Sequence, residues 1–159
     1  MRIRTAVSAD ATRMSEMLQR LVAAGKRTAR ADVDFVREHY IGHPVGIRCS
    51  LAEDDDGNLL GFQSLIRATD GNPYDTPTGW GIVGTHVSPD AARTGVGSQL
   101  FEVTRQAAIE AGLEKIEAFI GIGNEVAQAY YERMGFRTYR TTETAVCKCW
   151  SADALDGAG

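Results

Sequence analysis

A short stretch with two glycines carries the clearest chemical signal in the sequence. Residues 87–100 read VSPDAARTGVGSQL, which is the end of an apolar run, a turn, and then Gly95 and Gly97 at the opening of an amphipathic helix. The first turn of a helix presents unpaired N–H groups and the positive end of its dipole, and glycines let a phosphate approach the backbone closely. The stretch therefore predicts an anion-binding turn whose glycines serve binding rather than folding. A Gly-x-Gly pair also opens turns that only pack, and this alternative stays open.

Two common phosphate-binding motifs do not fit this stretch. A P-loop requires Lys and then Ser or Thr directly after its second glycine, whereas Ser98 and Gln99 stand there. A dinucleotide fingerprint requires a third glycine and an acidic residue roughly 20 residues further on, at the end of the next strand, and the sequence does not supply that pattern. The turn is thus expected to bind phosphate in another way.

The residue types that hold metals are sparse. The three cysteines are too few and too badly spaced for a zinc site, and their odd number suits a reducing compartment. His39 and His43 have the spacing of metal ligands on a helix, but Gly42 and Pro44 end the helix there and no third ligand is evident. We therefore predict no metal site.

The hydrophobic pattern indicates the elements that must position the glycine turn. In the first half of the chain they are a strand over 1–7, a helix that Ser8 caps and that ends near Gly25, a weaker helix over 32–40, a hairpin over 46–53 and 59–68, and a strand over 80–87. In the second half they are a helix from 95 to 112, a strand over 115–122, a helix over 124–134 that Gly135 stops, and a strand-like run over 136–150. The last run contains no Gly or Pro turn, so both an abbreviated hairpin and one long strand stay open.

This order of elements predicts one α/β domain over residues 1–150. Antiparallel-type strands come first and a strand–helix–strand unit follows, which indicates a mixed sheet of about six or seven strands with helices on both faces. Residues 151–159 contain no large apolar side chain except Leu155, and we expect them to form a frayed, disordered tail.

The charge balance limits the partners of the protein. The chain has 17 Lys and Arg against 21 Asp and Glu, a net charge of −4 and a pI near 5.4. Binding to a phosphate backbone requires a basic face, so nucleic acid is not expected as a partner. No apolar stretch approaches the roughly 18 residues of a membrane span, and the first ten residues lack the apolar run of a signal peptide. We expect a cytoplasmic protein without a membrane partner.

Two motifs taken together resemble those of the GCN5-related N-acetyltransferases, the GNAT family. The first is Val87-x-Pro89 followed by Gly95-x-Gly97, and the second is the segment 124–136, NEVAQAYYERMGF. The predicted order of elements also resembles that fold over nearly the whole chain. The resemblance implies a GNAT-like, mostly antiparallel sheet and an acetyltransferase that uses acetyl-coenzyme A (acetyl-CoA).

The resemblance also implies where acetyl-CoA binds. Its pyrophosphate would lie on the main-chain N–H groups of the glycine turn, its pantetheine arm would follow the strand that ends at Val87, and Asn124 would hydrogen-bond that arm. The cofactor-binding residues implied in this way are Thr85, Val87, Arg93, Thr94, Gly95, Val96, Gly97, Ser98 and Asn124. The chain departs from the family at Ala92, where Gln or Arg is preferred, and at Arg93, where glycine is usual. Main-chain donors survive both changes, so we expect binding and leave its affinity open.

For the reaction, the resemblance implies that a primary amine attacks the thioester directly. A strand N–H near Val87 would polarise the carbonyl oxygen, and Tyr131 would act as the general acid on the departing thiolate. The alternative for Tyr131 is packing, because Tyr130 stands beside it and one of the two must enter the core.

The attacking amine must also lose a proton. His86 lies beside the implied acetyl position and is our candidate base, although on a strand it alternates with Thr85 and a purely structural histidine fits equally well. Glu53, His39 and His43 are weaker candidates.

The acceptor remains open between a small amine and a protein N-terminus or lysine. The acceptor pocket implied by the resemblance contains Arg27, Arg30, Tyr40 and Tyr74. Two arginines suit a carboxylate on the substrate, which favours a small amino-acid-like or antibiotic-like amine, although solvated surface charge explains them too.

Two further expectations concern the protein as a whole. A coenzyme A-binding regulatory module without turnover is the alternative from another functional class, and Ala92 is the feature that favours it. Members of the family often pair through their C-terminal strands, and an edge with Ala145, Cys147 and Cys149 is apolar enough to pair, so we expect a homodimer.

Overall fold

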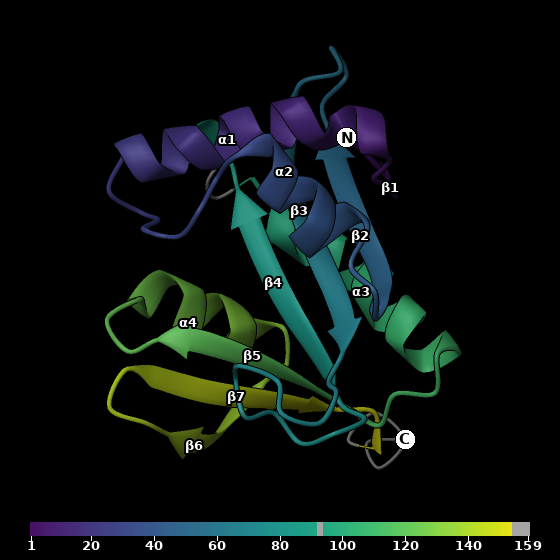
Figure 1. Ribbon diagram of the computed structural model, residues 1–159, viewed down its shortest axis with the longest axis vertical. Coiled ribbons are helices and arrows are strands. Elements are labelled where there is room, and N and C mark those ends of the chain that lie inside the picture. The colour runs from purple at the N-terminus through teal and green to yellow at the C-terminus, as the bar shows by residue number, and fades with distance from the viewer. Residues whose placement is uncertain (92–93, 154–159) are drawn as a thin grey trace.

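A seven-stranded mixed sheet organises the computed structural model, which describes residues 1–91 and 94–153 (Figure 1). Its strands follow the order β1-β2-β3-β4-β5-β7-β6, and every neighbouring pair is antiparallel except β4 and β5. The strands are β1 (Arg2–Thr5), β2 (Gly46–Glu53), β3 (Leu59–Arg67), β4 (Gly81–Val87), β5 (Lys115–Gly121), β6 (Arg137–Thr141) and β7 (Ala145–Ser151). The predicted mixed, mostly antiparallel sheet is confirmed.

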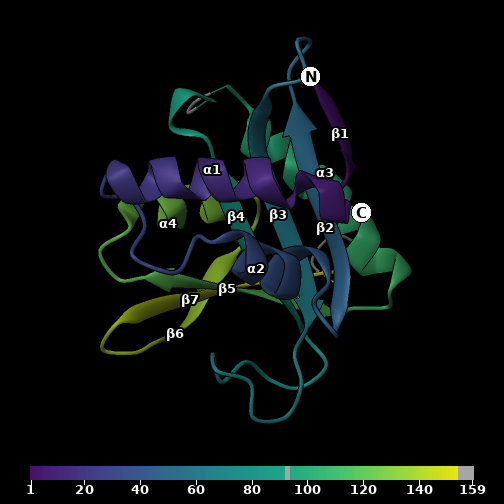
Figure 2. The same ribbon diagram turned by 45° about the horizontal axis from the view of Figure 1, so that its top comes forward.

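Helices cover both faces of the sheet, as predicted. They are α1 (Ala11–Ala23), α2 (Val33–Val36) with its π-helical continuation η2 (Arg37–Ile41), α3 (Val96–Glu110) and α4 (Glu125–Arg133), together with the short 3-10 turns η1 (Ser8–Asp10) and η3 (Pro89–Ala91). On one face α1 and α2 enclose a core that includes Leu18 and Phe62 (Figure 2). On the other face α3 and α4 enclose a second core around Phe101 and Ile116.

The start of α1 differs from the expectation that Ser8 caps it. Ser8 begins the turn η1 instead, and the carboxylate of Asp10 accepts the main-chain N–H of Val7 at 2.8 Å. A charged acceptor binds an N–H group more strongly than a hydroxyl does, and a negative charge is favoured where a helix begins. The prediction located the helix correctly and named the wrong residue at its start.

Asp10 belongs to a cluster of ion pairs that fastens β1, α1 and β2 together. Arg4 contacts Asp10 at 2.6 Å and Glu53 at 2.7 Å, and Arg13 contacts Glu53 at 2.5 Å. Hydrogen bonds from Arg4 are the main cause that lowers the pKa of Asp10 and of Glu53 to about 2. Glu53 is therefore a structural carboxylate, and the expectation that it could serve as a catalytic base is wrong.

A hairpin closes the chain, which decides between the two alternatives for residues 136–150. β6 and β7 pair antiparallel, and the turn between them needs neither Gly nor Pro. The main-chain N–H of Thr142 donates to Ala145 O at 2.9 Å, and the Thr142 hydroxyl accepts the N–H of Ala145 at 3.0 Å, so a side chain adds to the hydrogen bonding of the turn.

The position of β7 overturns the reason given for a homodimer. β7 lies between β5 and β6, so Ala145 and Cys147 are fully buried inside the sheet rather than at an apolar edge. The free edge on that side is β6, which carries Arg137 and Arg140. Charged side chains on an edge strand disfavour pairing with another chain. The homodimer stays a prediction without that support.

The ordered structure also extends past the predicted domain end at residue 150. Ser151 is the last residue of β7, and Ala152 donates its N–H to Glu114 O at 2.9 Å. The rest of the predicted tail, residues 154–159, lies outside the described residues.

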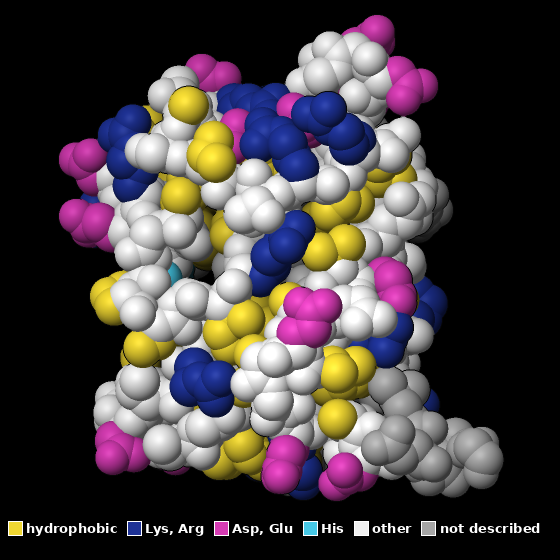
Figure 3. Space-filling view, turned by 90° about the vertical axis from the view of Figure 1, so that its right-hand side faces the viewer, with side chains coloured by type: hydrophobic (Ala, Val, Ile, Leu, Met, Phe, Trp, Pro, Cys, Tyr) yellow, Lys and Arg dark blue, Asp and Glu magenta, His cyan; other side chains and the backbone are white. Residues whose placement is uncertain are grey.

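The surface carries both signs of charge, interspersed with apolar side chains. Figure 3 shows this mixture on the face that turns β1 and β2 toward the viewer, with Lys and Arg side chains gathered in its upper part and acidic groups among them. Within residues 1–91 and 94–153, none of the helices combines the length and the apolar composition needed to cross a membrane.

We expect Glu53→Gln to lower the free energy of unfolding by about 2 kcal/mol near neutral pH, because Arg2, Arg4 and Arg13 all lose a charged acceptor. The pKa of Glu53 is lower in the folded chain than in the unfolded chain, so its stabilisation is complete above about pH 5 and is lost as the pH falls toward about 2. Urea unfolding at about pH 7 and about pH 2.5 measures this.

The control is Glu16→Gln, which changes an exposed carboxylate on α1. It should leave the unfolding midpoint nearly unchanged at both pH values. A difference between wild type and Glu53→Gln that is as large in acid as at neutral pH would contradict the ion-pair explanation.

Candidate active site

The two parallel strands of the sheet separate part-way along their length. β4 and β5 pair only from Gly81 to Val83 and from Ile116 to Ala118, although both strands continue beyond these residues. Figure 1 shows the two ribbons diverging. Backbone groups on the facing sides of the diverging segments therefore lack a partner strand among the described pairs.

The alternation of the backbone identifies which groups of β4 face this opening. Ser88 donates its N–H to Leu60 O on the side of β3. Backbone groups of alternate residues point to the same side of a strand, so those of His86 face β3 whereas those of Thr85 and Val87 face β5 and the opening. Two of the predicted cofactor-binding residues thus present main-chain N–H and C=O groups where β5 has moved away.

The predicted glycine turn leads into α3. Gly95 is its N-cap, with φ +82° and with no atom within 4 Å of the position that a Cβ would take. Val96 is buried, whereas Thr94 and Ser98 are exposed, and the Thr94 hydroxyl donates to Ala91 O at 2.6 Å. Ala92 and Arg93 lie outside the described residues. The turn thus combines a left-handed glycine, open space beside it and the N-terminal N–H groups of a fifteen-residue helix.

Gly97 corrects the expectation that both glycines serve binding rather than folding. A Cβ at this position would lie 2.6 Å from Cε1 of Tyr130. The Tyr130 hydroxyl also donates to Gly97 O at 2.7 Å. Gly97 is thus required for the packing of α4 against the start of α3, whereas the open space beside Gly95 fits the original prediction.

Tyr131 reaches the opening from α4. Its hydroxyl lies 2.7 Å from Oγ1 of Thr85, and only 5% of the residue is exposed. Burial is the largest influence on this phenol and raises its pKa above the ordinary value, whereas hydrogen bonds with the side chain and backbone of Thr85 lower the pKa by less. Packing and a position at the opening, which the sequence analysis treated as alternatives for Tyr131, thus occur together. Tyr131 packs in the core, and its hydroxyl still points at β4.

Gln63 on β3 completes this hydrogen-bonded group and is a residue that the sequence analysis missed. Its Nε2 donates to Oγ1 of Thr85 at 2.8 Å and to the Tyr130 hydroxyl at 3.0 Å. Because Thr85 accepts from Gln63, the hydroxyl proton of Thr85 is free for Tyr131, and the Tyr131 proton can then point elsewhere. The one available signal was a glutamine inside the apolar run 59–66, where a buried amide needs a partner.

Asn124 has a structural role at the start of α4. Its side chain accepts the N–H of Ala127 at 3.1 Å, which makes it the N-cap of that helix. The residue is exposed beyond the end of β5, so its predicted contact with the cofactor remains a prediction beside this cap.

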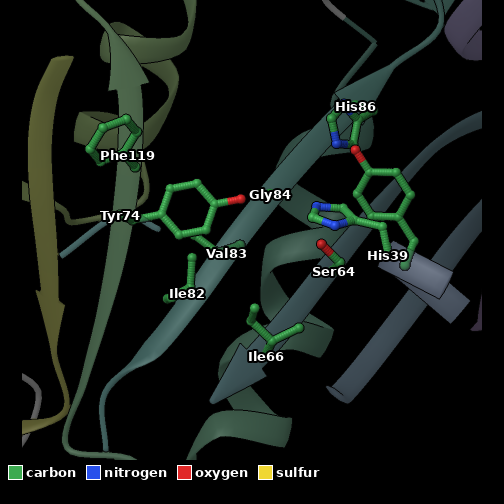
Figure 4. A pocket seen from close by; sticks show the side chains of 10 residues that line it. His39, Ser64, Ile66, Tyr74, Ile82, Val83, Gly84, His86 and Phe119 are labelled. Carbon is green, nitrogen blue, oxygen red and sulfur yellow. The ribbon is translucent and has the colours of Figure 1, made fainter. Parts of the chain in front are cut away.

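A pocket of about 150 Å³ lies on the opposite face of β4. Figure 4 shows Tyr74 and Phe119 on one side of it and His39 and His86 on the other. Its lining residues are His39, Tyr40, Ser64, Ile66, Tyr74, Ile82, Val83, Gly84, His86 and Phe119, and none of them is Lys, Arg, Asp or Glu. The π-helical segment η2 brings both His39 and Tyr40 to this pocket.

His86 lines the pocket and has little basicity. The imidazole lies between Tyr40 and Phe62, with ring centroids 5.2 and 4.7 Å away. Burial, followed by the charge of Arg27, lowers the pKa of His86 to about 3. Burial also lowers the pKa of His39, and His43 and Arg27 add to that effect. Both imidazoles are therefore neutral near pH 7.

The two arginines expected at the acceptor pocket differ in what they contact. Arg27 donates to the hydroxyl of Tyr40 at 3.1 Å, directly behind the pocket wall. Arg30 instead forms two hydrogen bonds of 2.9 Å with Asp32. One arginine rather than two thus contacts the pocket wall. In the described part of the chain, no cluster of three or more His, Cys, Asp or Glu side chains is placed to hold a metal.

The site has the main-chain opening, the helix start and the tyrosine that the two motifs predict. The sequence matches the Acetyltransferase (GNAT) family model over residues 14–136. The chain belongs to the GNAT family. No curated protein sequence matches it.

Solved structures agree with this assignment at the level of the fold. The GNAT chain superposes on a GCN5-related N-acetyltransferase from Kribbella flavida with a TM-score of 0.77 and 21% identity, over 94% of this chain and 96% of that one. An aminoglycoside acetyltransferase in complex with coenzyme A and kanamycin superposes with a TM-score of 0.76 and 19% identity, over 98% of this chain and 96% of that one. A putative phosphinothricin N-acetyltransferase superposes with a TM-score of 0.72 and 20% identity, over 93% of this chain and 94% of that one.

We expect Gly97→Ala to lower the free energy of unfolding by about 1–3 kcal/mol, because the added methyl group overlaps the Tyr130 ring. Ser98→Ala changes an exposed neighbour in the same helical turn and is the control. Chemical denaturation of both variants measures the effect. A Gly97→Ala protein as stable as wild type would show that Tyr130 moves aside at no cost.

Proposed function

We propose that this GNAT protein transfers the acetyl group of acetyl-CoA to the primary amine of a small molecule that carries a carboxylate, such as an amino acid or an amino-acid-like antibiotic. One observation carries the proposal. The opening between β4 and β5 has free main-chain groups and the Tyr131 hydroxyl on one side, and an uncharged aromatic pocket backed by Arg27 adjoins it on the other.

The residues around the opening fit acetyl-CoA. When bound, it supplies an activated acetyl carbonyl and a thiolate leaving group. The N-terminal N–H groups of α3 would hold the pyrophosphate, and the open space beside Gly95 leaves room for its oxygens. The free N–H groups of Thr85 and Val87 would hold the pantetheine arm and donate to the carbonyl oxygen as negative charge develops there. Arg93, Thr94, Val96, Ser98 and Asn124 remain proposed contacts of the cofactor.

The pocket favours an amine that has already lost its proton. Burial and the charge of Arg27 disfavour the protonated forms of His39 and His86. The same influences disfavour an ammonium ion in the same place, so they lower the pKa of a bound amine. His86 then acts as a neutral hydrogen-bond acceptor that orients the amine. This role replaces that of a base that stores the proton, since an imidazole with a pKa of about 3 holds a proton poorly. As the C–N bond forms and the C–S bond breaks, the proton that the nitrogen loses goes to the departing thiolate, which leaves as the thiol, or to solvent.

Tyr131 supplies the hydrogen-bond donor for the leaving group. Its raised pKa keeps the phenol protonated throughout the working pH range. A thiol has a pKa of about 8.5, below that of the phenol, so donation of a hydrogen bond to the developing thiolate costs less than complete proton transfer. The contact with Thr85 keeps the hydroxyl at the opening, where the sulfur would leave.

The charges around the pocket support a carboxylate-bearing acceptor over a polycation. No acidic side chain lines the pocket to pair with a second ammonium group, and the nearby charge of Arg27 is positive. Arginine is well suited to bind a carboxylate. A matched structure is described as a putative phosphinothricin N-acetyltransferase, which is consistent with such an acceptor. The small pocket volume also favours a small molecule over a folded protein.

We expect thiol release from acetyl-CoA with small amino acids or phosphinothricin and little with kanamycin or spermidine. The assay panel is phosphinothricin, L-methionine, L-phenylalanine, kanamycin and spermidine. We expect at least about a tenfold higher kcat/KM for the best carboxylate-bearing amine than for either polycation, which corresponds to about 1.4 kcal/mol of discrimination. The reverse order would refute the acceptor class and leave the transferase assignment intact.

Binding of the donor is measured separately. Acetyl-CoA at about 100 times its dissociation constant should stabilise the fold by roughly 2.7 kcal/mol in a thermal-shift experiment. Binding without turnover of any amine would favour the regulatory module, and absence of binding at millimolar concentration would refute both functions.

We expect Tyr131→Phe to lower kcat by on the order of 10²-fold, with the dissociation constant of acetyl-CoA nearly unchanged. The ring and its packing remain, so only the hydroxyl is lost, which is the proposed donor to the thiolate and the partner of Thr85. The defect should shrink as the pH rises toward about 8.5, where the thiolate needs less help. Tyr130→Phe is the matched control, because it removes a hydroxyl that contacts Gln63 and Gly97 and should act mainly on stability. Wild-type turnover by Tyr131→Phe across this pH range would make Tyr131 purely structural.

A further inference from the structure

A fully buried carboxylate lies on the same face of β5 as the pocket, outside the proposed catalytic group. Glu117 is 0% exposed and stands two residues before Phe119, which lines the pocket. Arg140 contacts its carboxylate at 3.1 and 3.4 Å, and the hydroxyls of Thr76 and Tyr139 donate to it as well. The Arg140 side chain keeps 26% of its surface exposed, so only the carboxylate is fully withdrawn from water. Such a pair is weak evidence for a role in stability, because desolvation of the buried partner offsets much of the attraction. The cluster therefore calls for another explanation.

The partners of Glu117 come from two segments that are distant in the sequence. Tyr139 and Arg140 belong to β6, where the register with β7 shifts between Thr138 and Arg140. A bulge of this kind can place two successive side chains on one side of a strand, and both of these reach Glu117. Thr76 belongs to the segment between β3 and β4, residues 68–80. Figure 1 shows this segment crossing in front of β5 and β7.

The segment 68–80 has its own internal structure. Asn72 accepts the N–H groups of Tyr74 and Thr76 at 3.1 and 3.0 Å and donates to the carbonyls of Thr69 and Thr76 at 2.8 Å. Ala68 donates its N–H to Trp80 O at 2.8 Å, which closes the segment at its base. These hydrogen bonds define the conformation of the loop itself, and contacts with the sheet then set its position.

Glu117 holds the loop through Arg140 at Tyr74, which lines the pocket. Arg140, held by the carboxylate, donates to the main-chain carbonyl of Tyr74 at 2.6 Å. The Tyr74 ring then packs against Phe119, with centroids 5.4 Å apart, and faces His39 and His86 across the pocket (Figure 4). The Thr76 hydroxyl ties the same loop to the same carboxylate.

We propose that Glu117 is a specificity-determining positioning residue, which sets the width of the amine pocket by holding the loop 68–80, and with it Tyr74, against β5 through Arg140 and Thr76. The assignment of the pocket to the amine rests on the proposed function. Glu117 itself touches no reacting atom. It acts through Tyr74, so its loss should affect the amine and leave acetyl-CoA binding intact.

The first measurement needs no substrate. Hydrogen exchange followed by mass spectrometry reports the opening of peptides that cover residues 68–80. In Glu117→Gln and Thr76→Val, exchange in these peptides should become at least about tenfold faster, while peptides from α3 and α4 keep their wild-type rates. Thr76→Val keeps the Glu117–Arg140 pair and removes a single hydrogen bond. It therefore tests the attachment of the loop to Glu117 even if Glu117→Gln does not fold. Thr104→Val is the matched control, because it makes the same change at a buried hydroxyl that has no hydrogen-bond partner among the described residues.

The second measurement separates the two substrates. In both loop variants the KM of the best amine from the panel should rise at least about tenfold, the dissociation constant of acetyl-CoA should stay within about twofold, and Thr76→Ser should restore the wild-type KM. Tyr74→Ala should raise the amine KM in the same way, and adding Glu117→Gln to it should raise the KM little further, because the two residues act in one chain of contacts.

Unchanged exchange in residues 68–80 for both folded variants would overturn the proposal, as would equal losses for the amine and acetyl-CoA. If wild type acetylated none of the amines, the proposed function would fail, whereas the exchange experiment would still decide whether Glu117 holds the loop.

Discussion

The site depends on one interruption in the hydrogen bonding of the sheet. Backbone N–H and C=O groups are almost always paired in a folded protein, and a strand inside a sheet normally satisfies them on both sides. β4 does so on the side of β3 along its whole length, but on the side of β5 the pairing stops at Val83. The groups of Thr85 and Val87 then need partners from elsewhere, and an extended ligand arm with amide groups can supply them. The fold thereby leaves unpaired strand groups in the middle of a sheet rather than at its outer edge.

The alternation of side chains along β4 divides the site into two compartments. Thr85 points toward α4 and is held by Gln63 of β3 and Tyr131 of α4. His86 points the other way, toward η2 and the aromatic pocket. Under the proposed function, acetyl-CoA bound along the backbone between them would meet the Tyr131 hydroxyl on one side and the amine on the other. A shift of register by one residue would exchange the two compartments, so the pairing of β4 with β3 fixes which side chains face each of them.

The sequence was informative where local patterns determine the structure. Helix periodicity, the strand pattern of the predicted hairpin over 46–68 and the family motifs located the strands up to β5 and the Gly95 turn with small errors, because these features depend on near neighbours along the chain. The missed features depend on contacts between distant segments. Gly97 looks like a phosphate-binding glycine until Tyr130 is placed against it, and Ala145 and Cys147 look like an apolar edge until β6 covers that side. Likewise, nothing around Glu117 in the sequence indicates that Arg140 and Thr76 will enclose it.

The placement of charge connects these contacts to the chemistry. Asp10, Glu53 and Glu117 are buried carboxylates, and each is held by arginines. No carboxylate lines the pocket between η2, β4 and the loop 68–80. An acetyltransferase must nevertheless remove a proton from its amine. A carboxylate there would stabilise the ammonium form and oppose attack unless it also accepted the proton. Under the proposed function, an uncharged pocket near Arg27 would make the ammonium form unfavourable, so the amine would give its proton to solvent before it binds. In this proposal the charge of Arg27 and the shape of the aromatic wall would together select the amine, and that shape would depend on how firmly the loop that carries Tyr74 is held.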